Sequence, residues 1–239
     1  MIDVEFHDRA LYLPGADVLV CSDLHLGRDA TSAVRAPLGE RRDITGRLRA
    51  LCDRFFPTEV VLAGDVLHSF SGTPGDVAES FDGIVREIET QDLGLTITPG
   101  NHDAMLGGLW GGHTPAQYRI GSDEEVTDGG EVVVCHGHEL PEEGGAGTYV
   151  IGHDHPAIEI EGQRRPCYLY GSGAHGGADV LMLPAFTRLA AGVPVNGSSA
   201  RDFQSPLVTD LEGFRPIVRD EASDETLWFP PLDEFRSML

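Results

Sequence analysis

Aspartate, asparagine and histidine residues follow five short apolar runs at the point where each run ends. The runs cover residues 18–21, 60–64, 95–98, 132–135 and 148–152. They are rich in β-branched residues and bounded by Gly, Pro or Asp, so we interpret them as buried strands. Ligands bind outside the carboxyl ends of strands in open α/β sheets. We therefore expect one edge to gather Asp23, His25, Asp65, Asn101, His102, Asp103, His136, His153 and His155.

These side chains suit divalent transition metals. Imidazole and carboxylate together favour Mn, Fe, Co, Ni or Zn over Ca. Asp23 and His25 are two positions apart, as are His153 and His155, and in an extended chain each pair would point the same way. Two divalent ions bring a formal charge of about +4, of which Asp23 and Asp65 remove about two. The remaining positive charge calls for an anionic substrate such as a phosphate ester.

The order of these blocks resembles that of the calcineurin-like metallophosphoesterases. The blocks are Asp23-Leu24-His25, Gly64-Asp65-Val66-Leu67-His68, Gly100-Asn101-His102-Asp103, His136-Gly137-His138 and Gly152-His153-Asp154-His155. The segments 155–158, 183–186 and 192–196 also resemble a small archaeal branch of this family, described as SbcD-related or ICC-like. The resemblance implies that the chain is a metal-dependent hydrolase of phosphoric esters.

The resemblance also implies a role for each ligand. One ion would be held by Asp23, His25, Asp65 and His155, and the other by Asp65, Asn101, His136 and His153. Asp65 would bridge two divalent ions, with Mn favoured and Fe, Co, Ni or Zn as alternatives. A metal-bound hydroxide would attack phosphorus, and His102, oriented by Asp103, would protonate the leaving group.

Three residues beside the blocks have two interpretations each. His68 either contacts the substrate or the metal ligands, or begins a helix without a role. His138 either faces the same site as His136 or is a loop histidine. Arg28 either binds a phosphate through its two-pronged guanidinium or is a solvated surface residue.

Missing features narrow the expected substrate. The chain lacks the second-block Tyr of purple acid phosphatases and the phosphate-binding Arg residues of Ser/Thr protein phosphatases. Only 84 residues follow His155 (239 − 155), too few for the large DNA-capping region of SbcD. We expect a small phosphodiesterase acting on a nucleotide or nucleic-acid phosphoester. One alternative is a phosphomonoesterase. Another is a non-catalytic metal-binding module, but such members typically lose several ligands or the acid histidine, and this chain has all of them. The sequence does not identify protein partners.

The periodicity of the chain predicts an α/β fold. Residues 40–56 and 76–90 have helical apolar spacing, and their alternation with strands over residues 17–98 predicts parallel βαβ units. After residue 112 the chain has short strands and Gly-rich loops. We expect two stacked mixed sheets flanked by helices, and the family resemblance implies a four-layer αββα sandwich. One domain would span residues 1–239, with the catalytic blocks in 17–155 and sheet completion and a tail in 156–239.

The composition predicts a cytoplasmic protein without membrane segments. No apolar run approaches the length of a transmembrane helix, and the acidic first residues are not typical of a signal peptide. Cys21, Cys52, Cys135 and Cys167 form no C-x-x-C motif, so we expect reduced thiols.

The charge of the chain is strongly negative. The formal net charge is −22, and all 17 basic residues are Arg. Such a surface repels itself at low ionic strength, whereas roughly 1 M salt shortens the Debye length to about 3 Å. An acidic chain without Lys is typical of a protein from a halophile that accumulates salt. The charge therefore does not exclude a nucleic-acid substrate.

We predict that dilution of salt destabilises the protein. The melting temperature should rise between roughly 0.1 and 2 M KCl, because screening removes the self-repulsion of the acidic surface. Thermal unfolding at graded KCl concentrations measures this effect. A melting temperature that stays constant over the range would contradict adaptation to salt.

Overall fold

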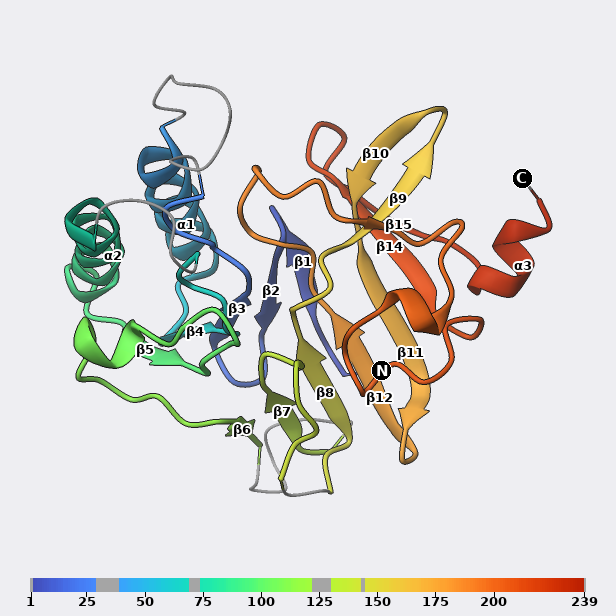
Figure 1. Cartoon of the computed structure of the whole chain (residues 1–239), viewed down its shortest axis with the longest axis horizontal. Coiled ribbons are helices and arrows are strands. Elements are labelled where there is room, and N and C mark those ends of the chain that lie inside the picture. The colour runs from blue at the N-terminus through green and yellow to red at the C-terminus, as the bar shows by residue number, and fades with distance from the viewer. Residues whose placement is uncertain (1, 29–38, 69–73, 122–129, 143–144, 239) are drawn as a thin grey trace.

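A computed structural model describes residues 2–28, 39–68, 74–121, 130–142 and 145–238 of the chain (Figure 1). Its first sheet has the strand order β1-β2-β3-β4-β5. These strands are β1 (Glu5–His7), β2 (Ala10–Leu13), β3 (Val18–Cys21), β4 (Glu59–Leu62) and β5 (Gly94–Ile97). The pairs from β1 to β3 are antiparallel, and those from β3 to β5 are parallel. This sheet is therefore mixed, with its parallel part in the predicted βαβ region.

The second sheet has the order β15-β14-β11-β12-β8-β7-β6 and is also mixed. Its strands are β6 (Tyr118–Ile120), β7 (Val132–Val134), β8 (Thr148–Ile151), β11 (Tyr168–His175), β12 (Ala178–Met182), β14 (Arg215–Asp220) and β15 (Glu225–Trp228). A small third sheet joins β10 (Gln163–Pro166), β9 (Pro156–Ile160) and β13 (Val193–Pro194). All five strands that were predicted to carry ligands are present as β3, β4, β5, β7 and β8.

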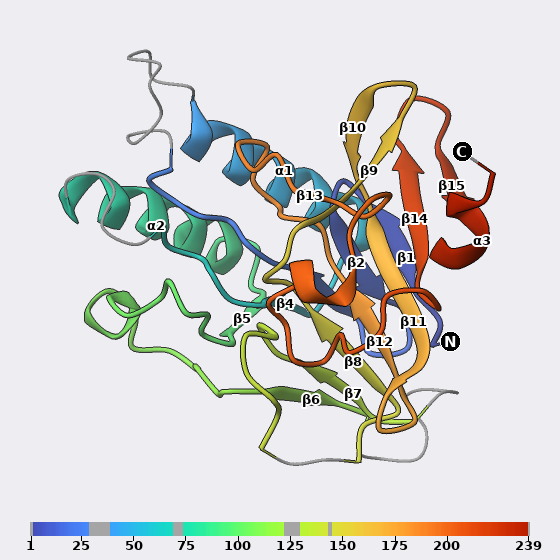
Figure 2. The same ribbon diagram turned by 45° about the vertical axis from the view of Figure 1, so that its right-hand side comes forward.

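The helices α1 (Glu40–Phe55) and α2 (Pro74–Glu89) lie side by side on the outer face of the first sheet (Figures 1 and 2). Their apolar stripes, which include Leu48 and Phe81, are buried against Leu19 and Leu62 of the sheet. The backbone turns out of α1 at Phe56, which is left-handed with φ 50°, just before Pro57. Pro cannot continue a helix, so the sequence fixes this end. Both helices thus match their predicted ranges closely.

The inner faces of the two sheets share one apolar core. Side chains of β2, β3 and β4 pack there against those of β7, β8, β11, β12 and β14. The members from the first sheet include Leu11, Val20 and Val61, and those from the second include Val134 and Leu181, all fully buried. The predicted stacking of two mixed sheets is therefore confirmed.

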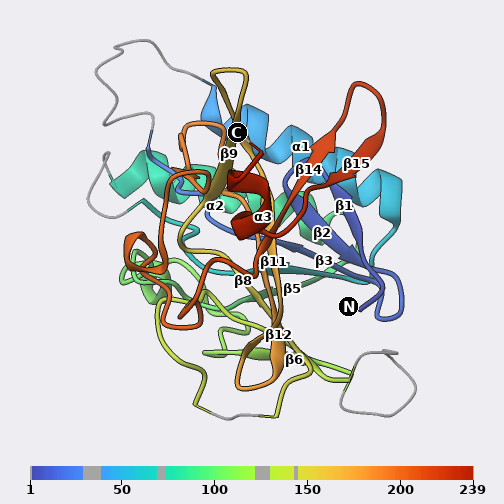
Figure 3. The ribbon, with the colours of Figure 1, turned by 90° about the vertical axis from the view of Figure 1, so that its right-hand side faces the viewer.

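The outer face of the second sheet is covered mainly by irregular chain, as the turned view in Figure 3 shows. Phe203, Leu207, Leu211 and Phe214 from the segment before β14 pack on this face. Short helices, η3 (Ala200–Asp202) and α3 (Leu232–Arg236), complete the layer. The fourth layer of the sandwich thus contains little helix, because segment 193–214 is rich in Gly, Pro and Ser. Within the described residues, no helix combines the length and the apolar character needed to cross a bilayer.

We predict that Tyr168→Phe destabilises the protein by about 1–2 kcal/mol. The fully buried Tyr168 hydroxyl of β11 donates a 2.7 Å hydrogen bond to the Ala10 carbonyl of β2, so it links the two sheets. The variant leaves that carbonyl buried without its donor. Chemical denaturation measures the change. Tyr149→Phe is the control, because this buried tyrosine of β8 makes no hydroxyl hydrogen bond within the described residues, and equal losses in both variants would contradict the prediction.

Candidate metal centre

Two turns at the carboxyl ends of β3 and β4 carry the buried carboxylates. Asp23, His25 and Asp65 all have left-handed backbones, with φ of 57°, 48° and 48°. The two turns hold each other, because the Asp23 N–H donates to the Gly64 carbonyl at 3.0 Å and the His25 N–H donates to the Asp65 carbonyl at 2.9 Å. Non-Gly residues rarely adopt this conformation, and it clusters at functional sites.

The second sheet contributes its ligands from the ends of β7 and β8. His136 follows β7, and His153 and His155 follow β8 with φ of 77° and 49°. The extended geometry that we expected for the two pairs with i, i+2 spacing is therefore wrong. The left-handed turns rotate each side chain separately, and His153 and His155 point into different ligand groups. Sequence spacing alone cannot reveal this, because it depends on positive φ at non-Gly residues.

The first ligand group contains Asp23, His25 and His155, and its ligand atoms lie within 4.8 Å of one another. The Nε2 atom of His155 lies 3.1 Å from Asp23 Oδ1 and 3.1 Å from His25 Nε2. Burial opposes ionisation of Asp23, but the charge of His155 and its hydrogen bond hold the pKa of this carboxyl well below its usual range. Burial lowers the pKa of His25 to about 3, so this ring is neutral with a lone pair available.

The second ligand group contains Asp65, His136 and His153, within the same 4.8 Å limit. His136 Nε2 lies 3.4 Å from Asp65 Oδ1, 3.1 Å from His153 Nδ1 and 3.2 Å from Asn101 Oδ1. The Ala63 carbonyl faces the other ring nitrogen of His136 at 3.1 Å, which orients the ring. Burial opposes protonation of His136, but the Asp65 hydrogen bond and the charge of Asp23 raise the pKa to about 9.

Asp65 lies between the two groups. Its Oδ1 faces His136, and its Oδ2 lies 3.9 Å from His25 Nε2. In both groups, ring nitrogens face one another at 3.1 Å beside carboxylate oxygens, so that several lone pairs converge at each point. Two cations would satisfy these lone pairs and neutralise both carboxylates. The donor set therefore fits two divalent transition ions, with Asp65 placed where a bridging ligand would be needed.

His102 and Asp103 lie in the turn after β5. The His102 N–H donates to Asp65 Oδ1 at 2.9 Å, and its Nε2 lies 3.8 Å from Asp65 Oδ2. Its side chain is 34% exposed, so the ring is at the open side of the site. The buried Asp103 carboxylate accepts hydrogen bonds from the Leu67 and Gly100 N–H groups at 2.9 and 2.8 Å. Asp103 therefore fixes the His102 turn against the turn after β4, and burial raises the pKa of its carboxyl.

The three residues with open interpretations all lie beside the centre. The His68 ring stacks on that of His102, with centroids 5.8 Å apart. The His138 ring lies 5.2 Å from that of His136. The Arg28 N–H donates to the His25 carbonyl at 3.1 Å, and the charge of Arg28, after burial, lowers the pKa of His68. His68, His138 and Arg28 therefore lie near the site, as one of the two interpretations of each requires. Their roles stay predictions.

Three glycines that we did not assign to the site make its close packing possible. A Cβ at Gly152 would lie 2.4 Å from Asp23 Oδ2, and one at Gly100 would lie 2.2 Å from Asp65 Oδ1. A Cβ at Gly64 would lie 2.5 Å from the His136 ring. Each glycine directly precedes a ligand residue, and this repeated placement was the available sequence signal.

Asp154 was also missed as a supporting residue. Its carboxylate points away from the ligand groups and accepts hydrogen bonds from the Gln204 and Ser205 N–H groups at 2.7 and 3.0 Å. It thereby fixes the turn between His153 and His155 to the outer layer of the second sheet.

A sandwich of two mixed sheets with two His/Asp groups at its strand ends defines a metal-dependent hydrolase of phosphoesters. The chain belongs to the calcineurin-like phosphoesterase family, whose sequence profile matches residues 16–183. This family is dinuclear and metal-dependent, in agreement with the two candidate ligand groups. No curated protein matches the sequence closely enough to count as a relative.

Three solved structures match this chain at low sequence identity. The nuclease MPE of Pseudomonas putida is 22% identical with a TM-score of 0.56, and the match covers 91% of this chain and 96% of that protein. The E. coli phosphoesterase Yfce is 14% identical with a TM-score of 0.44, covering 90% and 98%. A predicted phosphoesterase of Streptococcus pneumoniae is 15% identical with a TM-score of 0.31, covering 89% and 96%. The first of these supports the fold alone.

We predict that Asp65→Ala abolishes binding of both ions, because its carboxylate faces both ligand groups. Metal analysis after loading with Mn²⁺ and desalting should give about two ions per wild-type chain and fewer than one for the variant. Asp179→Asn is the control, since this carboxylate of β12 accepts hydrogen bonds from the Tyr170 and Ser172 hydroxyls and pairs with Thr148 at the start of β8, at the other end of the strand from His153. Retention of two ions by Asp65→Ala would contradict the assignment.

Proposed function

We propose that the chain is a phosphodiesterase that hydrolyses a nucleotide or nucleic-acid phosphoester at the dinuclear centre. The observation that carries this proposal is the presence of a cavity beside each ligand group. One cavity of about 300 Å³ includes His155 among its lining residues, and another of about 270 Å³ includes His136. A phosphodiester has two substituents on phosphorus, and each cavity would take one of them.

Two bound divalent ions would supply positive charge beside the phosphoryl oxygens and lower the pKa of a water molecule. The first ion would be held by Asp23, His25 and His155, the second by Asn101, His136 and His153, with Asp65 shared. The residues of the chain would then position the substrate and move a proton.

His102 is the proton donor in this proposal. Its Nε2 lies on the exposed side of Asp65, and its backbone is fixed by the Asp65 carboxylate and by Asp103 through the surrounding turns. The stacked His68 ring limits rotation of the His102 imidazole. Since a leaving oxygen would approach from the open side, His102 is placed to protonate it.

The fold likeness to the Pseudomonas putida nuclease is consistent with action on a diester of nucleic acid. Segments 155–158, 183–186 and 192–196 support placement in the small archaeal SbcD-related branch. We also propose Mn²⁺ as the metal, from the mixed imidazole and carboxylate ligands. The charge of −22 without Lys supports a salt-adapted protein, and the four free cysteines support a cytoplasmic location. We further propose that residues 1–239 form a single domain.

We predict that the Mn²⁺-loaded protein cleaves bis(4-nitrophenyl) phosphate with a higher kcat/KM than 4-nitrophenyl phosphate. Each cavity then holds one ester group of the diester. The assay should be run in high-salt buffer, and chelation should abolish both activities. A preference for the monoester would instead favour a phosphomonoesterase, and absence of both activities would contradict catalysis.

In the same assay His102→Gln should keep both ions but lower kcat by roughly 10²–10⁴ for diesters with poor leaving groups. The loss should shrink for nitrophenolate, which needs little protonation. His175→Gln, on the distant β11–β12 hairpin, is the control. If His102→Gln loses metal, or slows all leaving groups equally, His102 is not the proton donor.

A further inference from the structure

The cavity beside His155 is lined by an unusual set of charges. Three arginines, Arg9, Arg164 and Arg188, line it, and among its described lining residues there is no Asp or Glu. The chain as a whole has 39 acidic residues against 17 arginines. Three of the 17 arginines of this acidic chain therefore line one cavity. We call it the arginine cavity. Its volume of about 300 Å³ is at the lower end of the range for small-molecule sites.

The arginine cavity adjoins the first ligand group. The loop from β12 to β13 passes between α1 and the β9–β10 hairpin, as Figures 1 and 2 show. In this loop the Phe186 N–H donates to the Ser22 carbonyl at 2.8 Å, and the Thr187 N–H donates to the Asp23 carbonyl at 3.2 Å. The wall of the cavity is therefore bonded to the same turn that carries the Asp23 ligand.

The three arginines reach the cavity from separate parts of the fold. Arg9 comes from the β1–β2 turn, and its Nη1 donates to the Ala185 and Thr187 carbonyls at 3.1 and 2.5 Å. Arg164 comes from β10, and its Nη1 donates to the Gly192 carbonyl at 3.3 Å. These acceptors are neutral, so they orient the guanidinium groups without cancelling their charge. Arg188 differs, because its Nη1 donates to Asp43 of α1 at 3.0 Å and its Nη2 lies 3.8 Å from Asp8 Oδ1. The charge of Arg188 is therefore partly compensated, and Arg9 and Arg164 carry most of the positive charge offered to a ligand.

Arg9 lies among charges of both signs. Burial, followed by the charge of Arg47, lowers the pKa of Arg9 to about 10; Arg188 acts in the same direction, whereas the charges of Asp8 and Asp43 oppose the shift. A partly buried guanidinium gains more from an anionic ligand than a solvated one does.

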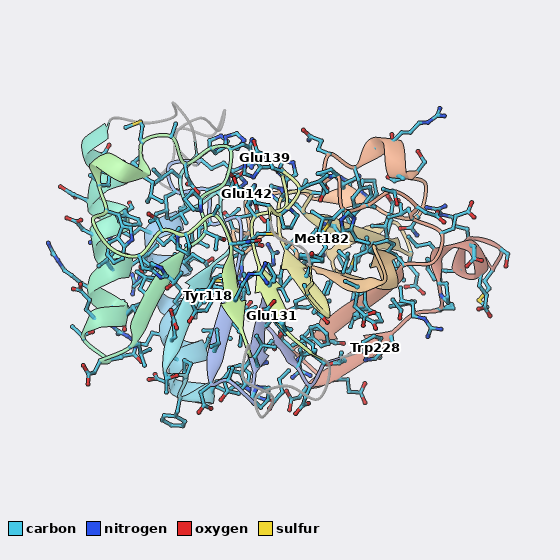
Figure 4. The ribbon with its side chains drawn as sticks, turned by 90° about the horizontal axis from the view of Figure 1, so that it is seen from below. Tyr118, Glu131, Glu139, Glu142, Met182 and Trp228 are labelled. Atoms are coloured by element: carbon cyan, nitrogen blue, oxygen red, sulfur yellow. The ribbon has the colours of Figure 1, made fainter. Side chains whose placement is uncertain are left out.

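The cavity at the other ligand group has the opposite charge. Glu139 and Glu142 line it together with His138, and they lie close to each other in the view of Figure 4. The metal centre therefore lies between a basic cavity at the His155 end and an acidic cavity at the His136 end. A substrate with further negative charge on one side would be oriented by this difference.

We propose that the arginine cavity binds a second phosphate of the substrate, one nucleoside away from the scissile phosphoester. This inference rests on the proposed phosphodiesterase function and adds a specificity site to it. The chemical class of the substrate is then a nucleotide or strand with at least two phosphates. The other substituent of the scissile phosphorus, which carries no second phosphate, would occupy the acidic cavity. This substituent is either a nucleoside or the leaving group.

The test compares two esters with the same leaving group. These are thymidine 5′-(4-nitrophenyl phosphate) and the same ester with an additional 3′-phosphate. The Mn²⁺-loaded wild-type protein should cleave the second with a higher kcat/KM. Arg164→Gln should lower this preference about 10-fold or more, the loss expected for one charge-assisted hydrogen bond. The change should appear mainly in KM, because Arg164 binds a remote group.

Arg165→Gln is the matched control. Arg165 is the next residue of β10, is also exposed, has the same charge and does not line the cavity. It should leave the preference for the second phosphate unchanged. Equal kcat/KM of the wild-type protein for both esters, or equal losses in Arg164→Gln and Arg165→Gln, would overturn the arginine cavity while leaving the phosphodiesterase in place. Failure of the loaded protein to cleave either ester would instead overturn the proposed function.

Discussion

The structure depends on the burial of two carboxylates at one point. Asp23 is 0% exposed and Asp65 is 2% exposed, and an ionised carboxylate without compensating charge is costly in such surroundings. Four imidazoles and one amide surround them, namely His25, His136, His153, His155 and Asn101. The two carboxylates drive His136 towards its charged form. Two divalent ions remove this cost, so that metal binding and the stacking of the two sheets are energetically linked.

The side chains around the two carboxylates are positioned by strained backbone conformations. Asp23, His25, Asp65, His153 and His155 are all left-handed, a conformation that costs non-Gly residues of order 1 kcal/mol each or more. Close packing against Gly64, Gly100 and Gly152, and the backbone hydrogen bonds between the turns, hold them in place. The rigid parallel strands below supply the support, since the turns follow directly from β3, β4 and β8.

Much of this could be predicted from the sequence, for identifiable reasons. The five apolar runs, the two helices and the sheet stacking follow from periodicity, which reports burial directly. The separation of His153 from His155 was expected from the family resemblance but not from their spacing, because left-handed Asp and His residues have no marker in the sequence. Neither the resemblance nor the spacing indicates the arginine cavity. Its members Arg9, Arg164 and Arg188 are far apart in the chain, and only the tertiary fold brings them beside His155. The role of Asp154 was also not predicted, because the backbone N–H groups that its carboxylate binds, those of Gln204 and Ser205, lie far along the chain.

The basic and acidic cavities distinguish the two ends of a site whose two ligand groups are otherwise similar. The proposed catalysis and the proposed orientation of the substrate both depend on two ions being bound where the side chains converge. Anomalous diffraction from crystals of the Mn²⁺-loaded protein tests that claim most directly. We expect two peaks about 3.5–4 Å apart, one among Asp23, His25 and His155 and one among His136, His153 and Asn101, with Asp65 between them. A single peak, or peaks outside these groups, would contradict the dinuclear centre.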